Sequence, residues 1–221
     1  AIDRADCLIG AKRILDSAAA PSKKRVEAVL PEEIAGFIRA RGEFRRIAVL
    51  LSGDTGIFSG VKRLLPALAD CEVEVLPGVS SLSYLCARLK TSYEDVVPVS
   101  LHGRDEDILR AVRDNPRVFV LSGGNGAMAR LCRVLTDAGL GHVKMHIGER
   151  LSYPEENITS GTAAELTSRE FDEMSAALIE NDRAGVPVPH GLPAEAFARE
   201  RGRPTVKSKA RAGQPRPVHT A

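Results

Sequence analysis

Short runs rich in β-branched residues alternate with amphipathic helical stretches along most of this chain, and glycine or proline separates one from the next. Alternation of this kind is typical of parallel βα units, because each helix carries the chain back to the start of the next strand. The clearest unit has a strand at Ile47–Leu51, a polar loop at 52–56 and a helix over 61–68 with apolar residues on one face. The sequence therefore predicts an α/β fold.

The same pattern predicts the remaining elements and two domains. Strands are expected at Val73–Leu76, Val96–Leu101, Arg117–Leu121, Val143–Ile147, Glu156–Ser160 and Ala176–Ile179. Helices are expected over 82–89, 105–115 and 128–138, with a short one starting near Ala163. We expect an amino-terminal domain over 1–115 and a smaller carboxy-terminal domain over 116–181, with the boundary near residue 115.

Residues 182–221 differ in composition from the rest of the chain. They hold eight Lys and Arg against three Asp and Glu, six of the 13 prolines, and almost no large apolar residue after Phe197. Such a segment buries too little apolar surface to offset the entropy of ordering it. We expect a basic, proline-rich tail or linker.

The overall charge and the cysteines restrict the classes of partner. Lys and Arg total 31 and Asp and Glu total 29, so no global field favours nucleic acid or an anionic membrane. The apolar runs are far shorter than the ~20 residues of a transmembrane helix. The four cysteines lie far apart without metal-ligand spacing, and no leader opens the chain. We expect a cytoplasmic protein with no metal site, no membrane anchor and no nucleic-acid partner.

Polar loops follow several of the expected strands, where parallel sheets bind their ligands. In the loop at 52–56, glycine lets the backbone approach a ligand, and Asp54 can accept hydrogen bonds from it. The alternative is that Asp54 only caps the next helix. Ser80 and Ser81 are equally open, since serine is an ordinary N-cap residue.

A second loop supports a different class of function. Gly124–Ala129 matches the G-x-G-x-x-A dinucleotide pattern, follows a strand and opens a helix, and Glu149 comes after the next strand. This pattern predicts an NAD-dependent oxidoreductase, although a lone match often reflects turn geometry alone. The chain has no Walker A sequence, so nucleoside triphosphate hydrolysis is not expected.

Two polar clusters stand at the ends of expected strands. One is His102 with Arg104, and the other is Glu149 with Arg150 and Tyr153. An arginine fork binds a carboxylate through two parallel hydrogen bonds, which suits a polycarboxylate substrate. The alternative is a surface salt bridge between Glu149 and Arg150 or their neighbours.

Six segments of the sequence resemble a known family. Residues 51–60, 77–85 and 99–104 are similar to the precorrin-6Y methyltransferase branch of the tetrapyrrole methylases. Residues 148–156, 161–166 and 178–181 agree with that branch in the same order. The resemblance covers about residues 6–200. The segments around His102 and 148–156 are more specific than the Gly-Asp loop at 52–56, which all tetrapyrrole methylases share.

The resemblance implies a two-domain α/β fold that binds S-adenosylmethionine in a cleft between the domains. It also implies methylation of a corrin-precursor tetrapyrrole carbon in cobalamin biosynthesis, by a homo-oligomer. The residues that it places at the cofactor are Ser52, Gly53, Asp54, Ile57, Ser80, Ser81, Ser122 and Leu151.

Residue type and loop position suggest roles toward the substrate. Arg104 and Arg150 are the candidates for binding its acidic side chains, and Glu149 and His102 are those for moving a proton. An electron-rich macrocycle carbon attacks the sulfonium methyl, so alignment and exclusion of water are the main tasks of the protein.

The sequence also departs from the family. Family members begin with a strand and a Gly-x-Gly-Pro-Gly loop that this chain lacks, and an empty sheet position is therefore expected. Residues 190–197 resemble the junction that leads, in fused relatives, to a decarboxylating methyltransferase domain. Two explanations stay open for the lack of that domain: a separate decarboxylating subunit, or a truncated reading frame. A non-catalytic fragment or subunit is the further alternative.

Overall fold

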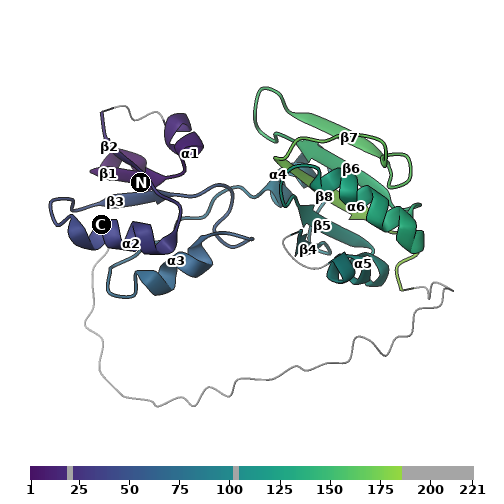
Figure 1. Ribbon diagram of the computed structural model, residues 1–221, viewed down its shortest axis with the longest axis horizontal. Helices are drawn as coiled ribbons and strands as arrows, with labels where there is room; N and C mark the ends of the chain where they lie inside the picture. The colour runs from purple at the N-terminus through teal and green to yellow at the C-terminus, as the bar shows by residue number, and fades with distance from the viewer. Residues whose placement is uncertain (19–21, 102–104, 186–221) are drawn as a thin grey trace, which may run out of the picture. The chain divides into compact units, whose positions relative to one another are not determined.

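Residues 1–18, 22–101 and 105–185 are described by the computed structural model, and they contain two sheets (Figure 1). The predicted site residues His102 and Arg104, and the tail from residue 186 onward, lie outside the described residues. The first sheet has the order β2-β1-β3, with all strands parallel. Its strands are β1 (Cys7–Gly10), β2 (Lys24–Glu27) and β3 (Ile47–Leu50).

Helices cover both faces of the three-stranded sheet. Cys7 and Ile9 of β1 pack with α2 (Pro31–Ala40) and α3 (Val61–Ala67), whereas Leu8 packs with α1 (Lys12–Ser17) on the opposite face. This arrangement follows from the alternation of side chains along a strand, which sends successive residues to opposite faces. Because both faces are covered, β1 is fully buried and apolar throughout.

The prediction of a strand at Val73–Leu76 is wrong. This segment forms no ladder, and Val73, Val75 and Leu76 are all exposed. β3 is consequently the last strand of the sheet on that side, paired with β1 alone. A hollow of about 1370 Å³ is lined by β3 and residues 72–78, together with residues near the amino-terminal end of the described chain. Strand pairing requires a partner at hydrogen-bonding distance, and no described segment supplies one here.

The second sheet has five strands in the order β4-β5-β8-β6-β7. β4 and β5 are parallel, as expected for a βα unit, and the other three pairs are antiparallel. The expectation of parallel βα units is therefore wrong for β6, β7 and β8. The link between β6 and β7 holds only residues 150–156, too few for the crossover that a parallel pair needs. The strands are β4 (Val97–Ser100), β5 (Arg117–Leu121), β6 (Lys144–Glu149), β7 (Asn157–Thr162) and β8 (Ser175–Glu180).

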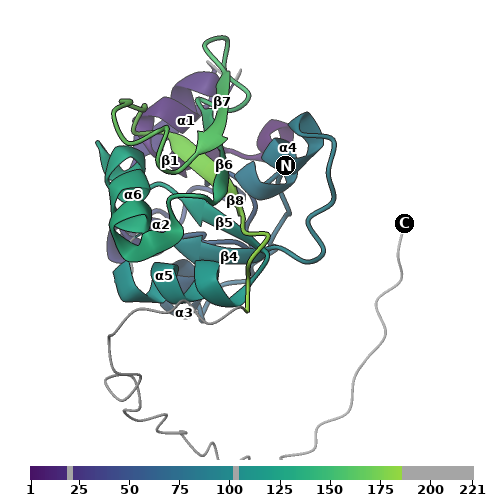
Figure 2. The same cartoon turned by 90° about the vertical axis from the view of Figure 1, so that its right-hand side faces the viewer.

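Helices lie on both faces of this sheet (Figure 2), and each face has its own apolar cluster. α5 (Asp105–Asp114), α6 (Ala127–Leu135) and the π-helical segment η2 (Thr136–Leu140) pack on one face. α4 (Ser81–Arg88) packs on the other, against the fully buried Phe119 of β5. The helix that starts at Ser80 is therefore fixed to the centre of the sheet.

Most of the predicted elements after residue 46 are confirmed within one to four residues, but not the short helix near Ala163. Residues 163–168 form turns instead. In one of these turns the N–H of Leu166 donates a hydrogen bond of 3.1 Å to the carbonyl of Thr162. β4 pairs with β5 across the predicted boundary at 115, and that boundary stays a prediction. Within the described part of the chain, no helix is long and apolar enough to cross a membrane.

Candidate functional site

The loop at 52–56 follows β3 at the carboxyl end of the three-stranded sheet. Gly53 has φ of 74°, which glycine adopts without strain, and Ser52 is exposed. The carboxylate of Asp54 accepts a hydrogen bond of 2.7 Å from the N–H of Gly56. Asp54 therefore closes its own loop. The alternative that it caps the next helix is wrong, because the N-cap of α3 is Gly60 and no side chain caps it.

The loop at 52–56 is also tied to residues 76–78, which precede α4. The N–H of Gly78 donates to Asp54 at 3.3 Å, and the hydroxyl of Thr55 donates to the carbonyl of Leu76 at 3.4 Å. A Cβ added to Gly78 would lie 2.2 Å from the carbonyl oxygen of Gly53. Only glycine allows the two backbones to approach so closely.

The serines before α4 act first as local structure. Ser80 is the N-cap of α4, and its hydroxyl accepts a hydrogen bond of 3.0 Å from the N–H of Ser83. Ser80 is buried, and Ser81 is the first residue of the helix. Ile57 packs against the apolar cluster of α4, so the loop after β3 and this helix share a core. Three predicted cofactor residues thus lie on connected segments.

Ser122 follows β5 and shapes the glycine-rich loop after it. Its hydroxyl donates to the carbonyl of Gly124 at 3.3 Å and accepts from the N–H of the same residue at 3.2 Å. Gly124 and Gly126 have φ of 116° and 68°. The dinucleotide-like pattern is thus explained by the backbone conformation of a strand-to-helix turn.

Leu151 lies in the turn between β6 and β7. Its side chain is half-buried and packs against the cluster under α4. A Cβ on Gly148 would stand 2.6 Å from this side chain, so the glycine makes room for it. Leu151 is thereby held on the same face of the sheet as α4.

Glu149 and Arg150 are both engaged with neighbouring groups. The Nε of Arg150 donates to Asp172 at 2.7 Å. Glu149 accepts from the side-chain amide of Asn157 and from the N–H of Asp172, each at 2.9 Å. The pKa of Asp172 is lowered by the N–H of Met174 and by Arg150. The salt bridge that the sequence left as an alternative is therefore formed, between Arg150 and Asp172. The roles of Glu149 and Arg150 toward the substrate stay predictions.

Sequence reasoning missed Glu156, which joins the turn at 150–153 to α4. Its carboxylate contacts Arg88 at 2.8 Å and accepts from the N–H of Ser152 at 2.7 Å. Tyr84 and Arg88 stand one helical turn apart on α4, and this spacing was a readable signal of a shared face. The sequence could not show that both residues contact Glu156, about 70 residues later, because this contact depends on how α4 packs on the sheet.

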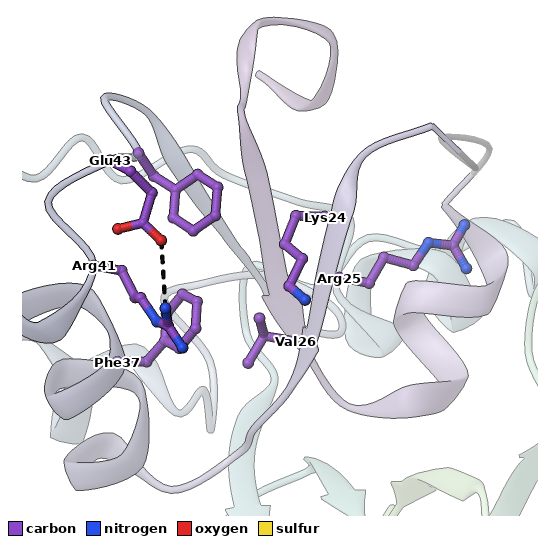
Figure 3. A pocket seen from close by; sticks show the side chains of 7 residues that line it. Lys24, Arg25, Val26, Phe37, Arg41 and Glu43 are labelled. Atoms are coloured by element: carbon purple, nitrogen blue, oxygen red, sulfur yellow. Dashed lines mark ion pairs between the residues drawn. The ribbon is translucent and has the colours of Figure 1, made fainter.

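A second hollow lies at the edge of the three-stranded sheet, beside β2 and the end of α2 (Figure 3). It measures about 400 Å³ and contains none of the predicted site residues. Arg41 pairs with Glu43 at 3.6 Å and lies over the ring of Phe37 at 5.9 Å. The stacked rings of Phe37 and Phe44 form its apolar wall.

Comparisons with known proteins agree on one family. A sequence model of the tetrapyrrole (corrin/porphyrin) methylases matches residues 1–167. The match includes all eight residues predicted at the cofactor and the four predicted toward the substrate. The comparisons give no support to the NAD-dependent oxidoreductase.

Two curated relatives differ in how much of their own length is matched. The cobalt-precorrin-7 C(5)-methyltransferase of Salmonella typhimurium is 32% identical over 186 residues, which cover 83% of this chain and 90% of the relative. The decarboxylating precorrin-6Y C(5,15)-methyltransferase of Sinorhizobium sp is 28% identical over 152 residues, covering 68% of this chain but 36% of the relative.

Solved structures support the same fold. The uroporphyrin-III C-methyltransferase of Thermus thermophilus, complexed with S-adenosylhomocysteine, superposes with a TM-score of 0.63 at 22% identity. The superposition covers 80% of this chain and 86% of that structure. At this identity the likeness shows the fold alone.

Proposed function

Because this chain belongs to the tetrapyrrole (corrin/porphyrin) methylases, we propose that it is an S-adenosylmethionine-dependent C-methyltransferase that acts on a corrin precursor in cobalamin biosynthesis. The predicted cofactor residues lie on loops that follow strands or precede helices, the places where this class of fold presents backbone groups to a ligand. The observation that carries the proposal is the approach of Gly78 to Gly53. It brings two backbone loops together at the carboxyl end of β3.

The coverage of the relatives favours one of the two methylations in the family. This chain matches almost the whole of a C(5)-methyltransferase but about a third of a C(5,15)-methyltransferase that also decarboxylates. We propose methylation at C5 of a precorrin-7-type substrate. Decarboxylation and methylation at C15 would then belong to a separate subunit.

The loops fit the chemistry of the cofactor. S-adenosylmethionine, when bound, supplies an electrophilic methyl group on a sulfonium. Exposed glycine-rich backbone at 52–56 can donate and accept hydrogen bonds along the adenosine and amino acid parts. Ile57 and Leu151 are half-buried apolar side chains, which exclude water from the methyl group.

The reaction requires few charged groups from the protein. The new bond joins a macrocycle carbon to the methyl carbon while the methyl–sulfur bond breaks, and the macrocycle afterwards loses a proton. Arg104 and Arg150 are our candidates for the carboxylates of the substrate, and Glu149 and His102 for that proton. Arg150 can reach a substrate carboxylate only by sharing or leaving Asp172, to which it is now bound.

Location and assembly form the finer part of the proposal. We propose a cytoplasmic homo-oligomer. The cysteines that the structure describes are free thiols, which fits a reducing compartment. Sedimentation of the purified chain tests the oligomer, and a monomer across the working concentration range would reject it.

Calorimetric titration with S-adenosylhomocysteine, with NAD as the parallel ligand, tests the function. Binding of the first alone supports the methyltransferase, and binding of NAD alone rejects it. Incubation with S-adenosylmethionine and a precorrin-7-type substrate should then add one methyl group to the product by mass spectrometry. Binding without turnover would support the non-catalytic subunit instead.

A further inference from the structure

The turn that joins β6 to β7 has a strained backbone. Arg150 and Ser152 have φ of 45° and 70°, in the left-handed region that residues other than glycine adopt at a cost. Leu151, between them, is one of the proposed cofactor residues. A strained turn keeps a single conformation only where neighbouring groups hold it.

Glu156 holds this turn from one side. Its Oε2 accepts a hydrogen bond of 2.7 Å from the N–H of Ser152, and its Oε1 lies 2.8 Å from the Nε of Arg88. The hydroxyl of Tyr84 donates to the same carboxylate. Only 12% of the Glu156 side chain is exposed, so these bonds are partly shielded from water.

The charge state of Glu156 agrees with this geometry. The N–H of Ser152 and the hydroxyl of Tyr84 hold the pKa of Glu156 below its ordinary value, and Arg88 acts in the same direction. The carboxylate is therefore ionised at neutral pH and binds its three donors in its charged form.

Two of the three donors belong to one helix. Tyr84 and Arg88 are one turn apart on α4, whose first turn is capped by Ser80. α4 is itself anchored in the core by Leu85, which is fully buried and would stand 3.1 Å from a Cβ on Gly148. A bond from Glu156 to this helix thus connects the turn to the segment that carries Ser80 and Ser81.

We propose that Glu156 is a positioning residue that locks the turn at 150–153 onto α4. The lock keeps Leu151 and the loop at Ser80 in one arrangement, so that the two sides of the proposed cofactor site are prepared before binding. Glu156 acts through Ser152 and Arg88 and has no contact with the reacting atoms. This inference rests on the proposed function.

Three variants remove different numbers of the hydrogen bonds that Glu156 makes. Glu156→Ala removes every bond of the carboxylate, Glu156→Gln keeps an acceptor for Ser152 but loses the charge, and Tyr84→Phe removes one donor. Glu155→Gln is the matched control, because it removes an adjacent exposed carboxylate. Val112→Ala is a second control, since Val112 is a buried residue of α5 on the face of the same sheet opposite α4, so that the variant loses stability away from the turn.

The readout is the affinity for S-adenosylhomocysteine by calorimetry, with the KM for S-adenosylmethionine and kcat. We expect Glu156→Ala to weaken binding about tenfold, the factor that one lost charge-assisted hydrogen bond brings. Glu156→Gln should restore part of the affinity, and Tyr84→Phe should fall between it and the wild type. KM should rise more than kcat falls. Both controls should bind as the wild type does, even where the unfolding temperature of Val112→Ala is lower.

Amide hydrogen exchange tests the hydrogen bond between Ser152 and Glu156 without any ligand. In Glu156→Ala the amide of Ser152 should exchange at least about tenfold faster, while the centre of β5 stays protected. Unchanged exchange at Ser152, or affinity equal to the wild type, would overturn the inference. If the wild type binds no S-adenosylhomocysteine but the exchange result holds, the proposed function fails and the lock stands.

Discussion

Gly78 lies against Gly53 so closely that a methyl group on its Cα would stand 2.2 Å from the Gly53 carbonyl oxygen. The two glycines belong to different segments, one after β3 and one before α4. The N–H of Gly78 also donates to Asp54 in the same loop. The contact therefore fixes the distance between the two backbone loops that carry the proposed cofactor residues.

Gly78→Ala should separate these loops. The added methyl group meets backbone rather than a flexible side chain, so the loops must move, at a cost of about 1–3 kcal/mol in stability. We expect the affinity for S-adenosylhomocysteine to fall at least about tenfold by calorimetry. Gly36→Ala is the control: Gly36 is exposed in α2 with nothing near its Cβ position, and alanine there should raise stability by about 0.5–1 kcal/mol. Equal affinity in both variants would contradict the loop assignment.

Arg150 and Asp172 allow a test of substrate binding. Arg150→Ala should raise the KM for the tetrapyrrole about tenfold if the guanidinium binds a substrate carboxylate, and should leave the KM for S-adenosylmethionine unchanged. Asp172→Asn frees the guanidinium from its 2.7 Å ion pair and should keep the tetrapyrrole KM within about twofold. An unchanged KM in Arg150→Ala removes this residue from the substrate site.

The elements after residue 46 were predictable because their apolar residues have a clear period. α6 shows this well, since it buries the one face that its apolar spacing marks. β5 was predictable in another way, as a continuous apolar run that is buried on both faces of the sheet. The antiparallel direction of β6, β7 and β8 was not readable, because periodicity is the same in either direction. The short link of residues 150–156 between β6 and β7 was the available signal.

The candidate site was predictable in its loops but not in its contacts. The resemblance and the glycine-rich loops made Ser52, Gly53 and Asp54 candidates, but the hydrogen bond from Gly78 to Asp54 joins residues 24 positions apart. Val73–Leu76 has the composition of a strand and forms none, because a strand is stable only with a neighbour to bond. Local composition could not reveal either relation.

The ion pair of Arg39 and Asp70 predicts how stability depends on pH. Arg39 donates from Nε at 2.9 Å and from Nη2 at 2.8 Å to the two oxygens of Asp70. These hydrogen bonds lower the pKa of Asp70 to about 2. A carboxylate with a lowered folded pKa stabilises the protein above its unfolded pKa of about 3.9, and this contribution is lost as the pH falls toward 2.

We therefore expect Asp70→Asn to lower the urea midpoint at pH 7 by a small amount, since both side chains are more than half exposed. The difference from the wild type should shrink between about pH 4 and pH 2. Arg39→Gln should lower the urea midpoint by a similar amount, and the double variant should lower it no further than either single variant does. A difference that persists at about pH 2 would show that the pair is not its source.

The four cysteines should differ in their reactivity toward a thiol reagent. Cys7, Cys86 and Cys132 are fully buried, and burial raises the pKa of each, to about 11 for Cys132. Cys71 is half-buried and lies four residues after the end of α3. Because the thiolate is the reactive form, Cys71 alone should react with Ellman's reagent in the native protein at about pH 8, and all four should react in denaturant. Cys71→Ser should therefore abolish the reaction of the native protein with this reagent. If Cys132 reacted as fast as Cys71, the core under α6 would have to open far more often than its packing allows.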